Sequence, residues 1–241
     1  MRRLEKELIR INRFVAMSGV CSRRKADLLI KEGKVSVNNK TIYEVGVKVS
    51  AEDVVCFNGK QIFPEKKRYF LLNKPSGYIT TTNDEKGRKT VMTLIKDACK
   101  ERIVPVGRLD KETTGLLLFT NDGILAKKMM HPKHKVKKVY DVCLNRNMLD
   151  IEIEAIRHGI VLEDGVVHVD KIEYINNSRQ NIRIKIHIGK NRIVRRIFEF
   201  FNYKVLKLDR VEYASLTKKK LSIGKWRVLT KGELIVLHRN N

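Results

Sequence analysis

A single carboxylate, Asp110, has the surroundings best suited to catalysis. It lies in segment 107–111, with the sequence GRLDK, between a short apolar run and a leucine-rich run that starts at Gly115. The flanking cations Arg108 and Lys111 favour its ionised form. A turn held between two strands can present such a group rigidly to a substrate. An aspartate in a turn also serves as a turn-forming or capping residue, so the local sequence leaves both roles open.

The charge balance indicates what the substrate or partner is. The chain of 241 residues carries 51 Lys and Arg against 27 Asp and Glu, a net charge of +24. Because Lys and Arg neutralise phosphates and release counterions, an excess of this size favours a polyanionic partner. Nucleic acid is the first expectation and an anionic membrane surface the second. With 42% hydrophobic residues the chain has enough apolar side chains for folded cores, which excludes wholesale disorder.

Two basic clusters are candidates for phosphate contacts. Arg23, Arg24 and Lys25 open a predicted helix capped by Ser22, and a helix N-terminus itself attracts anions. Residues 123–140 hold six lysines and no Asp or Glu; the lysines are Lys127, Lys128, Lys133, Lys135, Lys137 and Lys138. Either cluster could also be a charged face that only contacts solvent.

Residues 1–63 predict a small N-terminal α/β domain. Apolar residues at near-helical spacing indicate helices within 11–19 and 21–34, which end at Gly19 and Gly33. Short β-like runs follow at 35–37, 45–49 and 54–57. The polar segment 64–68, which begins with a proline, is the expected linker.

Residues 69–241 predict a larger domain of the α+β class. Strand-like runs lie at 69–72, 115–120, 140–144, 166–169 and 182–188, and helical patterns at 91–101, 123–131, 149–158 and 191–201. These elements do not alternate as strict βαβ units. We therefore expect a mostly antiparallel or mixed sheet flanked by helices.

The sequence also argues against several locations and redox states. No apolar run reaches the roughly 18 residues that a membrane-spanning helix needs. Glu5 and Glu7 fall where a signal peptide has its apolar core, so we expect a cytoplasmic protein. The cysteines are too far apart for a zinc knuckle or a redox C-x-x-C motif, and we expect them to be reduced; they are Cys21, Cys56, Cys99 and Cys143.

Motifs of other enzyme classes are missing from the sequence. There is no G-x-G-x-x-G turn of the dinucleotide-binding type, and no H-x-E with P-C-x-x-C of the zinc deaminases. His131 and His134 are too closely spaced for an H-E-x-x-H zinc motif and have no acidic residue between them. We expect no metal site.

The first part of the chain resembles a known RNA-binding domain. Residues 22–26 (SRRKA) and 30–38 (IKEGKVSVN) match the pattern S-R-R-x-A followed by I-x-x-G-x-V-x-V-N. This pattern belongs to the small domain named for protein S-four of the small ribosomal subunit. Asn39 stands where a glycine is usual, and asparagine also tolerates a positive φ. The resemblance implies that the RNA contacts of this S-four-like domain are Arg13, Ser22, Arg23, Arg24, Lys25 and Lys34.

Residues 11–237 as a whole resemble the pseudouridine synthases of the RsuA/RluB group, which join such a domain to a catalytic domain. The matching segments keep the order of the family: 72–75 (LNKP), 107–110 (GRLD), 120–123 (TNDG), 138–140 (KVY), 189–196 (GKNRIVRR), Leu208, Arg210 and 224–227 (GKWR). Ile188 and Ile193 stand where many members have glutamate and glutamine.

This resemblance implies that the protein isomerises one uridine in a structured RNA: the glycosidic bond breaks, the base rotates and a carbon–carbon bond forms. Asp110 is then the catalytic carboxylate, as nucleophile or as base for a sugar proton. Tyr140 packs against the extruded base and Arg195 pairs with the carboxylate. Further pocket or RNA-binding positions are Arg108, Leu208, Lys135, Lys137, Lys138, Arg192 and Arg196. The reaction implies no metal or organic cofactor, and we expect a monomer.

Residues 86–91 (KGRKTV) look like those of members that act on large-subunit ribosomal RNA, which is the expected substrate. Small-subunit ribosomal RNA and transfer RNA remain open alternatives. So does a non-catalytic RNA-binding factor in ribosome assembly. The presence of Asp110, Tyr140 and Arg195 argues against that last alternative, because a binding module needs no carboxylate facing RNA phosphates.

Overall fold

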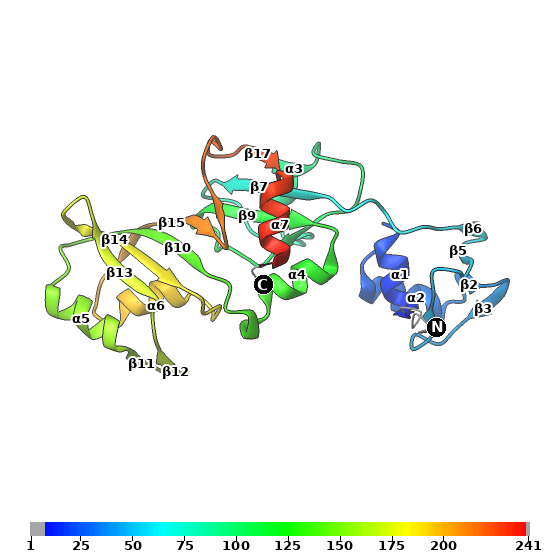
Figure 1. The fold of residues 1–241 in the computed structure, drawn as a ribbon, viewed down its shortest axis with the longest axis horizontal. Helices are drawn as coiled ribbons and strands as arrows, with labels where there is room; N and C mark the ends of the chain where they lie inside the picture. The colour runs from blue at the N-terminus through cyan, green and yellow to red at the C-terminus, as the bar shows by residue number, and fades with distance from the viewer. Residues whose placement is uncertain (1–7, 240–241) are drawn as a thin grey trace. The chain divides into compact units, whose positions relative to one another are not determined.

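The chain forms two compact units (Figure 1). The structure, a computed structural model, describes residues 8–239; the first unit ends at Lys67 and the second begins at Arg68. Glu5 and Glu7, on which the expectation about a signal peptide depends, lie outside the described residues. Within residues 8–239, no helix combines the length and the apolar character that crossing a membrane requires.

The first unit packs two short helices against small sheets. In chain order its elements are β1 (Ile9–Arg10), α1 (Ile11–Met17), α2 (Arg23–Lys31), β2 (Val35–Val37), β3 (Lys40–Ile42), β4 (Lys48–Val49), β5 (Val55–Phe57) and β6 (Lys60–Gln61). The strand order is β3-β2-β5-β6, with β1 and β4 as a separate pair. The two expected helices are confirmed, whereas only Lys48–Val49 of the expected strand at 45–49 is extended and paired.

Local sequence explains the helix α2. Ser22 caps its N-terminus by accepting a hydrogen bond from the backbone N–H of Lys25 at 3.3 Å. Gly33, with a φ of +68°, ends it in a left-handed conformation that suits glycine. Between these ends, Ala26 and Ile30 are buried against Phe14 of α1, so the helix is fixed by both caps and core.

The second unit is built on a large mixed sheet. Its strands are β7 (Tyr69–Lys74), β8 (Val104–Val106), β9 (Thr114–Thr120), β10 (Lys138–Leu144), β11 (Ile160–Leu162), β12 (Gly165–Val167), β13 (Lys171–Ile175), β14 (Ser178–Ile186), β15 (Val205–Tyr213), β16 (Leu216–Thr217) and β17 (Trp226–Val228). Its helices are α3 (Val91–Ile95), α4 (Gly123–Met130), α5 (Asp150–His158), α6 (Ile193–Glu199) and α7 (Lys231–Arg239), with a 3-10 turn at Pro132–His134.

The main path of the sheet runs β13-β14-β10-β15-β9-β7-β17. Neighbouring strands on this path are antiparallel except for β15 and β9, which pair in parallel over two residues, Asp209 with Thr114 and Arg210 with Gly115. The expected α+β class with a mostly antiparallel, mixed sheet is therefore confirmed.

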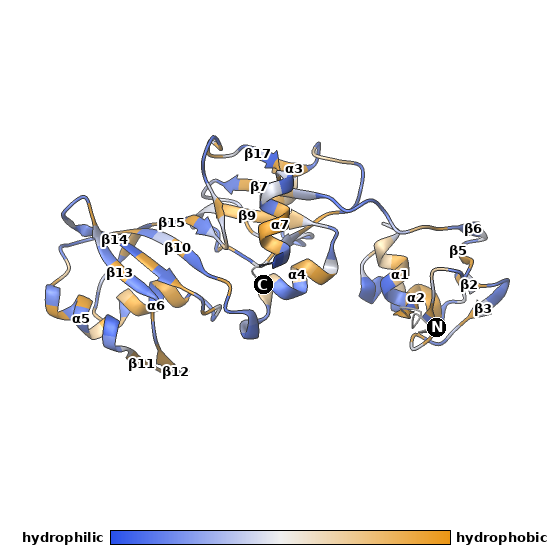
Figure 2. Ribbon diagram, in the orientation of Figure 1, coloured by the Kyte–Doolittle hydropathy of each residue, from blue (hydrophilic) through white to orange (hydrophobic). Residues whose placement is uncertain are grey.

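Alternating side chains give this sheet two apolar faces. In β9, Leu117 and Phe119 belong to one core cluster, whereas Leu116 and Leu118 belong to the other. Helices α3, α5 and α6 contribute to the first cluster, and α4 and α7 to the second. Figure 2 shows both hydrophobic and hydrophilic residues along α4 and α5, as expected of helices that bury one face.

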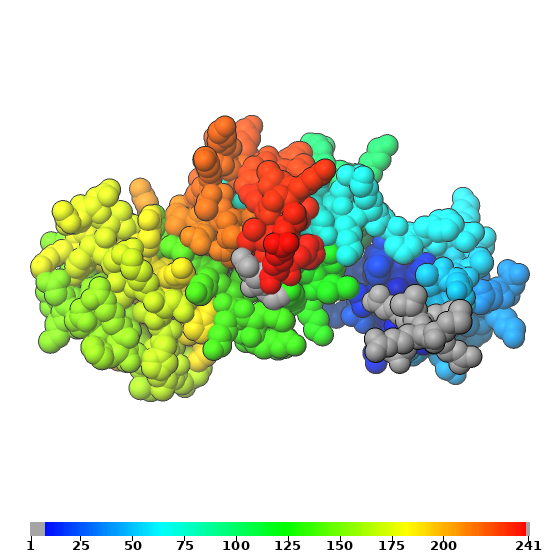
Figure 3. All heavy atoms as spheres, in the orientation of Figure 1, coloured from blue at the N-terminus to red at the C-terminus, as the bar shows by residue number. Residues whose placement is uncertain are grey.

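Helix α7 closes the second apolar layer from outside. Leu237 of α7 is buried in it, and Lys128 of α4 donates a hydrogen bond to the carbonyl of His238 at 3.2 Å. In the space-filling view, α7 lies on the surface of the second unit beside the segment that contains α4 (Figure 3). After β17, the chain therefore packs α7 against the second apolar face of the sheet.

Several elements differ from the sequence-based expectation. The helix expected at 91–101 ends at Ile95, and the chain then turns so that the N–H of Ala98 donates to the carbonyl of Ile95. The strand expected at 166–169 is the short β12, which pairs with β11. The strand β15 and the helix α7 were not expected from the apolar pattern, although β15 proves central to the sheet.

Candidate active site

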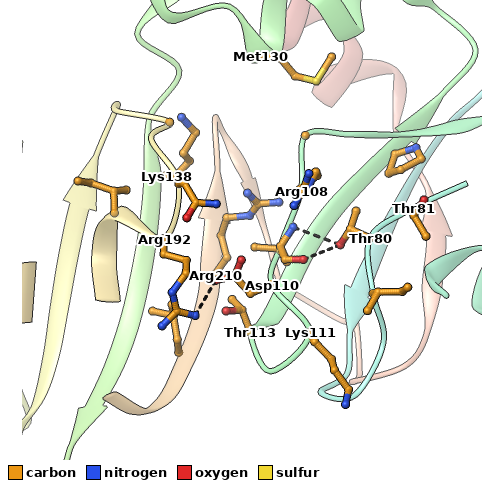
Figure 4. Close-up of a pocket in the computed structure, with 18 of the residues that line it drawn as sticks. Thr80, Thr81, Arg108, Asp110, Lys111, Thr113, Met130, Lys138, Arg192 and Arg210 are labelled. Carbon is orange, nitrogen blue, oxygen red and sulfur yellow. Dashed lines mark hydrogen bonds and ion pairs between the residues drawn. The ribbon is translucent and has the colours of Figure 1, made fainter. Parts of the chain in front are cut away.

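A cleft of about 1310 Å³ opens in the second unit where β9 and β15 meet (Figure 4). Six parts of the chain line it: residues 79–88, 104–113, 129–130 and 188–194, together with side chains of β10 and β15. Asp110, Arg108, Tyr140, Leu208, Lys138 and Arg192 are all among the lining residues. The structure thus brings together positions that lie up to about a hundred residues apart in sequence.

Asp110 lies in the loop between β8 and β9, and its backbone is held by a turn. The N–H of Thr113 donates to the carbonyl of Asp110 at 3.1 Å. On the other side, Thr80 exchanges two hydrogen bonds with Leu109: its hydroxyl donates to the Leu109 carbonyl at 2.8 Å and accepts from the Leu109 N–H at 3.2 Å. These contacts fix the residue directly before the carboxylate, so Asp110 is presented by a rigid loop.

A buried ammonium group supports the same loop from below. Lys74, at the end of β7, has no exposed surface, and its Nζ donates to the carbonyls of Pro75 at 3.0 Å, Lys111 at 3.0 Å and Thr113 at 2.8 Å. All three donors of the ammonium are therefore used. Burial lowers the pKa of Lys74 to about 8, and the carboxylates of Glu112 and Asp110 oppose that shift.

The floor of the cleft is formed by facing residues of β10 and β15. Tyr140 lies opposite Arg210 in the register of these strands, and Val142 lies opposite Leu208. Because alternate residues of a strand share a face, Tyr140, Leu208 and Arg210 point to the same side of the sheet. Tyr140 and Leu208 are 8% and 5% exposed, so each is both a core residue and a surface of the cleft.

The arginine nearest the carboxylate differs from the one expected. Nη1 of Arg192 lies 3.9 Å from Oδ2 of Asp110 (Figure 4). Arg195, which the resemblance assigned to this pairing, instead donates from Nη1 to the carbonyl of Val205 at 3.1 Å, and its Nε is buried without a hydrogen-bond partner. The expected pairing of Arg195 with Asp110 is thus not made in this structure. The reason is the backbone: Arg192 has a φ of +46° just before α6, which directs it toward the cleft, whereas Arg195 follows one turn into the helix.

The other predicted RNA-binding residues are dispersed. Lys138 lines the cleft, whereas Lys135 and Lys137 are exposed beside the 3-10 turn and are not among the lining residues. Arg196 donates to both carboxylate oxygens of Asp164 at 3.0 and 2.7 Å. In the first unit, exposed side chains gather at the start of α2 and at the following turn: Arg23, Arg24, Lys25 and Lys34. Arg13 of α1 is half-buried, and Ser22 acts as the cap of α2.

Three residues of the site have a structural role that the sequence analysis did not assign. Lys74 and Arg210 matched motifs of the resembling family but received no role, and Thr80 was not singled out. The signal for the first two was available, since each is a cation inside an otherwise apolar or alternating strand. Thr80 carries no such signal, because its partner Leu109 is set by tertiary structure.

The two isoleucines that depart from the family pattern both line the cleft. Ile193 is 5% exposed and belongs to the large core cluster, and Ile188 is half-buried and packs against the same cluster. Among the described residues, no group of three His, Cys, Asp or Glu side chains is placed to hold a metal ion.

Comparisons with known proteins agree with this architecture. The sequence profile of the family described as RNA pseudouridylate synthase matches residues 68–200, and that of the S4 domain matches residues 9–55. A ribosomal large subunit pseudouridine synthase B of Bacillus subtilis is 43% identical over 229 residues, which cover 93% of each chain. A dual-specificity RNA pseudouridine synthase RluF of Salmonella typhi is 34% identical and is covered over 78% of its length.

A solved structure supports the same grouping. A crystal structure of a pseudouridylate synthase superposes with a TM-score of 0.68 at 27% identity, covering 95% of this chain and 99% of the other. The match includes residues of both units. Taken with the two profiles and the cleft around Asp110, it identifies this chain as a member of the RsuA/RluB-type RNA pseudouridine synthases, the isomerases that convert uridine in RNA to pseudouridine.

Proposed function

We propose that this enzyme acts on a uridine of large-subunit ribosomal RNA and that Asp110 is its catalytic carboxylate. The observation that carries the role of Asp110 is its position on a rigid loop at a cleft shared with Tyr140 and Leu208. Asp84 of the same cleft is engaged by Arg88, whose Nε and Nη2 lie 3.1 and 2.5 Å from its Oδ1. Among residues 8–239, the ion pair of Asp110 is limited to the 3.9 Å approach of Arg192, so its carboxylate is available to a substrate.

The shape and chemistry of the floor support a flipped base. A uridine inside a helix cannot reach a carboxylate in a cleft, so it must leave the stack. Tyr140 offers a flat ring for the extruded uracil, and Leu208 an apolar wall beside it. A base held between them would have its sugar near the loop that carries Asp110.

The reaction needs only one carboxylate, because its bonds and protons balance within the substrate. The bond from N1 to C1′ breaks, a bond from C5 to C1′ forms, and the proton lost from C5 is matched by one gained at N1. The product is an isomer of the substrate, so no group is transferred to or from the protein. Asp110 can serve as nucleophile at C1′ or as base for a sugar proton, and both roles require the position described above.

The charged surfaces complete the proposal. Residues 1–63 act as the S-four-like domain, joined by the linker 64–68 to the catalytic domain 69–241. The exposed cations Arg23, Arg24 and Lys25 at the capped start of α2 bind backbone phosphates there. Lys135 and Lys137 extend a basic surface away from the cleft. The choice of ribosomal RNA rests on the Bacillus subtilis relative, which is named for the large subunit.

The test compares the wild type with Asp110→Asn on unmodified large-subunit ribosomal RNA. Pseudouridine is mapped by chemical adduct formation and reverse-transcription stops, because an isomerisation leaves the mass unchanged. A stop produced by the wild type only, with RNA affinity of the variant within a few fold, is the expected result.

The control is Asp97→Asn, which removes an exposed carboxylate outside the cleft and should leave turnover unchanged. Full turnover by Asp110→Asn would refute the catalytic role. A wild-type stop on small-subunit ribosomal RNA or transfer RNA, and none on large-subunit RNA, would refute the substrate assignment while preserving the role of Asp110.

A further inference from the structure

Arg210 carries a buried cation whose bonding is incomplete. Its side chain is 3% exposed and lines the cleft, with Nε donating to the carbonyl of Leu116 at 2.7 Å. The guanidinium carbon lies 4.4 Å from the ring centroid of Tyr213. Nη2, however, is buried without a hydrogen-bond partner. Since buried charged donors are nearly always paired, this nitrogen indicates a partner that comes with the substrate.

A second cation lines the same part of the cleft. Nζ of Lys138 donates to the carbonyl of His187 at 3.1 Å and lies 3.5 Å from that of Ile188. Burial and, to a smaller extent, the positive charge of Arg210 lower the pKa of Lys138 to about 8, against the opposing effect of Asp170. The carboxylate of Asp170 is itself 2.9 Å from Nδ1 of His187. No carboxylate within the described residues forms an ion pair with Lys138 or Arg210.

The register of the sheet places both cations beside Tyr140, the proposed contact surface for the extruded base. Lys138 precedes Tyr140 by two residues on β10 and so shares its face, while Arg210 lies opposite Tyr140 on β15. Figure 4 shows Arg210 in the interior of the cleft, on the same side of Asp110 as Lys138. A nucleotide whose base lies on Tyr140 would therefore bring its own backbone close to both groups.

We propose that Lys138 and Arg210 form a subsite for a phosphate of the RNA backbone next to the target uridine. This inference rests on the proposed function and adds the chemistry by which the nucleotide is held. A neutral uracil carbonyl could accept hydrogen bonds from these groups but would leave two cations unneutralised. A phosphate accepts from both, and the planar guanidinium matches its oxygens in particular.

The test uses the reactivity of Lys138 in the full-length wild type. Brief acetylation at pH 7.5, followed by peptide mass spectrometry, is repeated with increasing inorganic phosphate, uridine 5′-monophosphate or uridine. A bound phosphate keeps the ammonium protonated. A rise of one unit in its pKa slows acetylation about tenfold, since only the neutral amine reacts. We expect saturable protection by phosphate and by the monophosphate, and little by uridine.

Lys185 provides an internal control in every sample. It is a half-buried lysine of β14, opposite Val139, and lines a separate small cavity on the other face of the sheet. Its acetylation should not respond to phosphate. Equal slowing of Lys185 and Lys138, protection of Lys138 by uridine but not by phosphate, or no protection at all would each overturn the proposal.

Arg210→Lys tests the second member of the subsite. The variant keeps a buried cation but loses the planar fork, and we expect it to weaken phosphate protection of Lys138 several fold, with folding checked by thermal unfolding. Protection as strong as in the wild type would exclude Arg210 from the subsite. None of these measurements needs RNA turnover, so protection of Lys138 without conversion of any RNA would refute the proposed function and leave the phosphate subsite standing.

Discussion

Gly115 and Arg210 face each other across the short parallel pairing of β9 with β15, and their backbones touch so closely that no side chain fits at position 115. A Cβ at Gly115 would overlap the carbonyl oxygen of Arg210 and lie 2.5 Å from its nitrogen. The φ of Gly115 is +109°, which L-residues rarely adopt. One glycine therefore sets the distance between the two halves of the sheet and, with it, the position of the cleft floor.

Gly115→Ala is expected to lower the free energy of unfolding by about 2 kcal/mol or more, because it combines backbone strain with a steric overlap. Turnover should fall as β15 is displaced. Urea unfolding and the pseudouridine assay measure the two effects. The matched variant is Gly123→Ala at the start of α4, where an added methyl group meets open space, so stability should stay level or rise by about 0.5–1 kcal/mol. Equal stability of the two variants would contradict the steric argument.

We expect Arg192→Gln to reduce turnover about fivefold, because Arg192 is the cation beside Asp110. This factor corresponds to the interaction energy of a partly exposed ion pair. Arg195→Gln removes a hydrogen bond to Val205 and should instead lower stability by about 1 kcal/mol, with turnover nearly retained. Single-turnover rates and urea unfolding separate the two. Loss of turnover in Arg195→Gln alone would mean that Arg195 moves to the carboxylate when RNA binds.

Lys74 gives the stability a pH dependence whose sign can be derived. Its pKa is about 8 in the folded protein and 10.5 ordinarily, so below pH 8 the ammonium is charged in both states and the folded state bears the full cost of burying it. Between pH 8 and 10.5 the unfolded chain binds more protons, and the free energy of unfolding rises with pH. Relative to Lys74→Met, the wild type should gain up to about 3 kcal/mol over this range. A difference that stays flat or falls in urea titrations at these pH values would contradict this reasoning.

Asp164, in the turn between β11 and β12, anchors the segment that carries Arg192. It accepts two hydrogen bonds from Arg196, and Nζ of Lys190 donates to its backbone carbonyl at 2.7 Å. The bonds from Arg196 lower the pKa of Asp164 to about 2, so the anchor is complete above pH 4 and is lost as the pH falls through 2. Asp164→Asn should increase amide exchange in residues 188–192 and reduce turnover several fold.

The comparison for this anchor is Glu154→Gln, which breaks a similarly exposed ion pair with Arg157 on α5, away from the cleft. It should change neither exchange at 188–192 nor turnover. Unchanged exchange in Asp164→Asn would show that Arg192 is positioned by other contacts.

The start of α2 is expected to bind RNA through phosphates. Replacing Arg23, Arg24 and Lys25 together with alanine should weaken binding and reduce the slope of log affinity against log salt by about 0.9 for each phosphate that these side chains neutralise. The control replaces three exposed lysines on strands of the same unit: Lys40, Lys48 and Lys60. Both triple variants lose the same charge. An equal change of slope in the two would mean that only net charge matters.

Local patterns in the sequence predict the elements that depend on local physics. The caps at Ser22 and Gly33 bound α2 as expected, and the leucine-rich run after Gly115 is a central strand. The strand β15 was missed because Asp209 and Arg210 interrupt its apolar alternation. Their partners come from other parts of the chain: Asp209 pairs with Lys218 and accepts from the hydroxyl of Thr114, and Arg210 donates to the carbonyl of Leu116.

Sequence patterns likewise predict only part of the cleft. The motif around Asp110 pointed to one loop, and the structure places that loop at the cleft with Tyr140 and Leu208. Which arginine approaches the carboxylate depends on the left-handed backbone of Arg192, which no spacing in the run 192–196 specifies. Contacts made across the sheet, such as that of Lys74, appear only once the strands are assembled.

The parallel pairing of β9 with β15 also determines when the cleft can form. Thr114 and Asp209 are opposite in this pairing, and the Thr114 hydroxyl donates a hydrogen bond to the Asp209 carboxylate. They are 95 residues apart, so a long loop must close before the pairing stabilises anything. During synthesis, a chain that has emerged only as far as α6 already holds Asp110 and Tyr140 but lacks Leu208, Arg210 and Tyr213. The loop with the carboxylate is thus made early and its pocket late, and we expect a nascent or truncated chain to be inactive on RNA until the last strands of the sheet have joined.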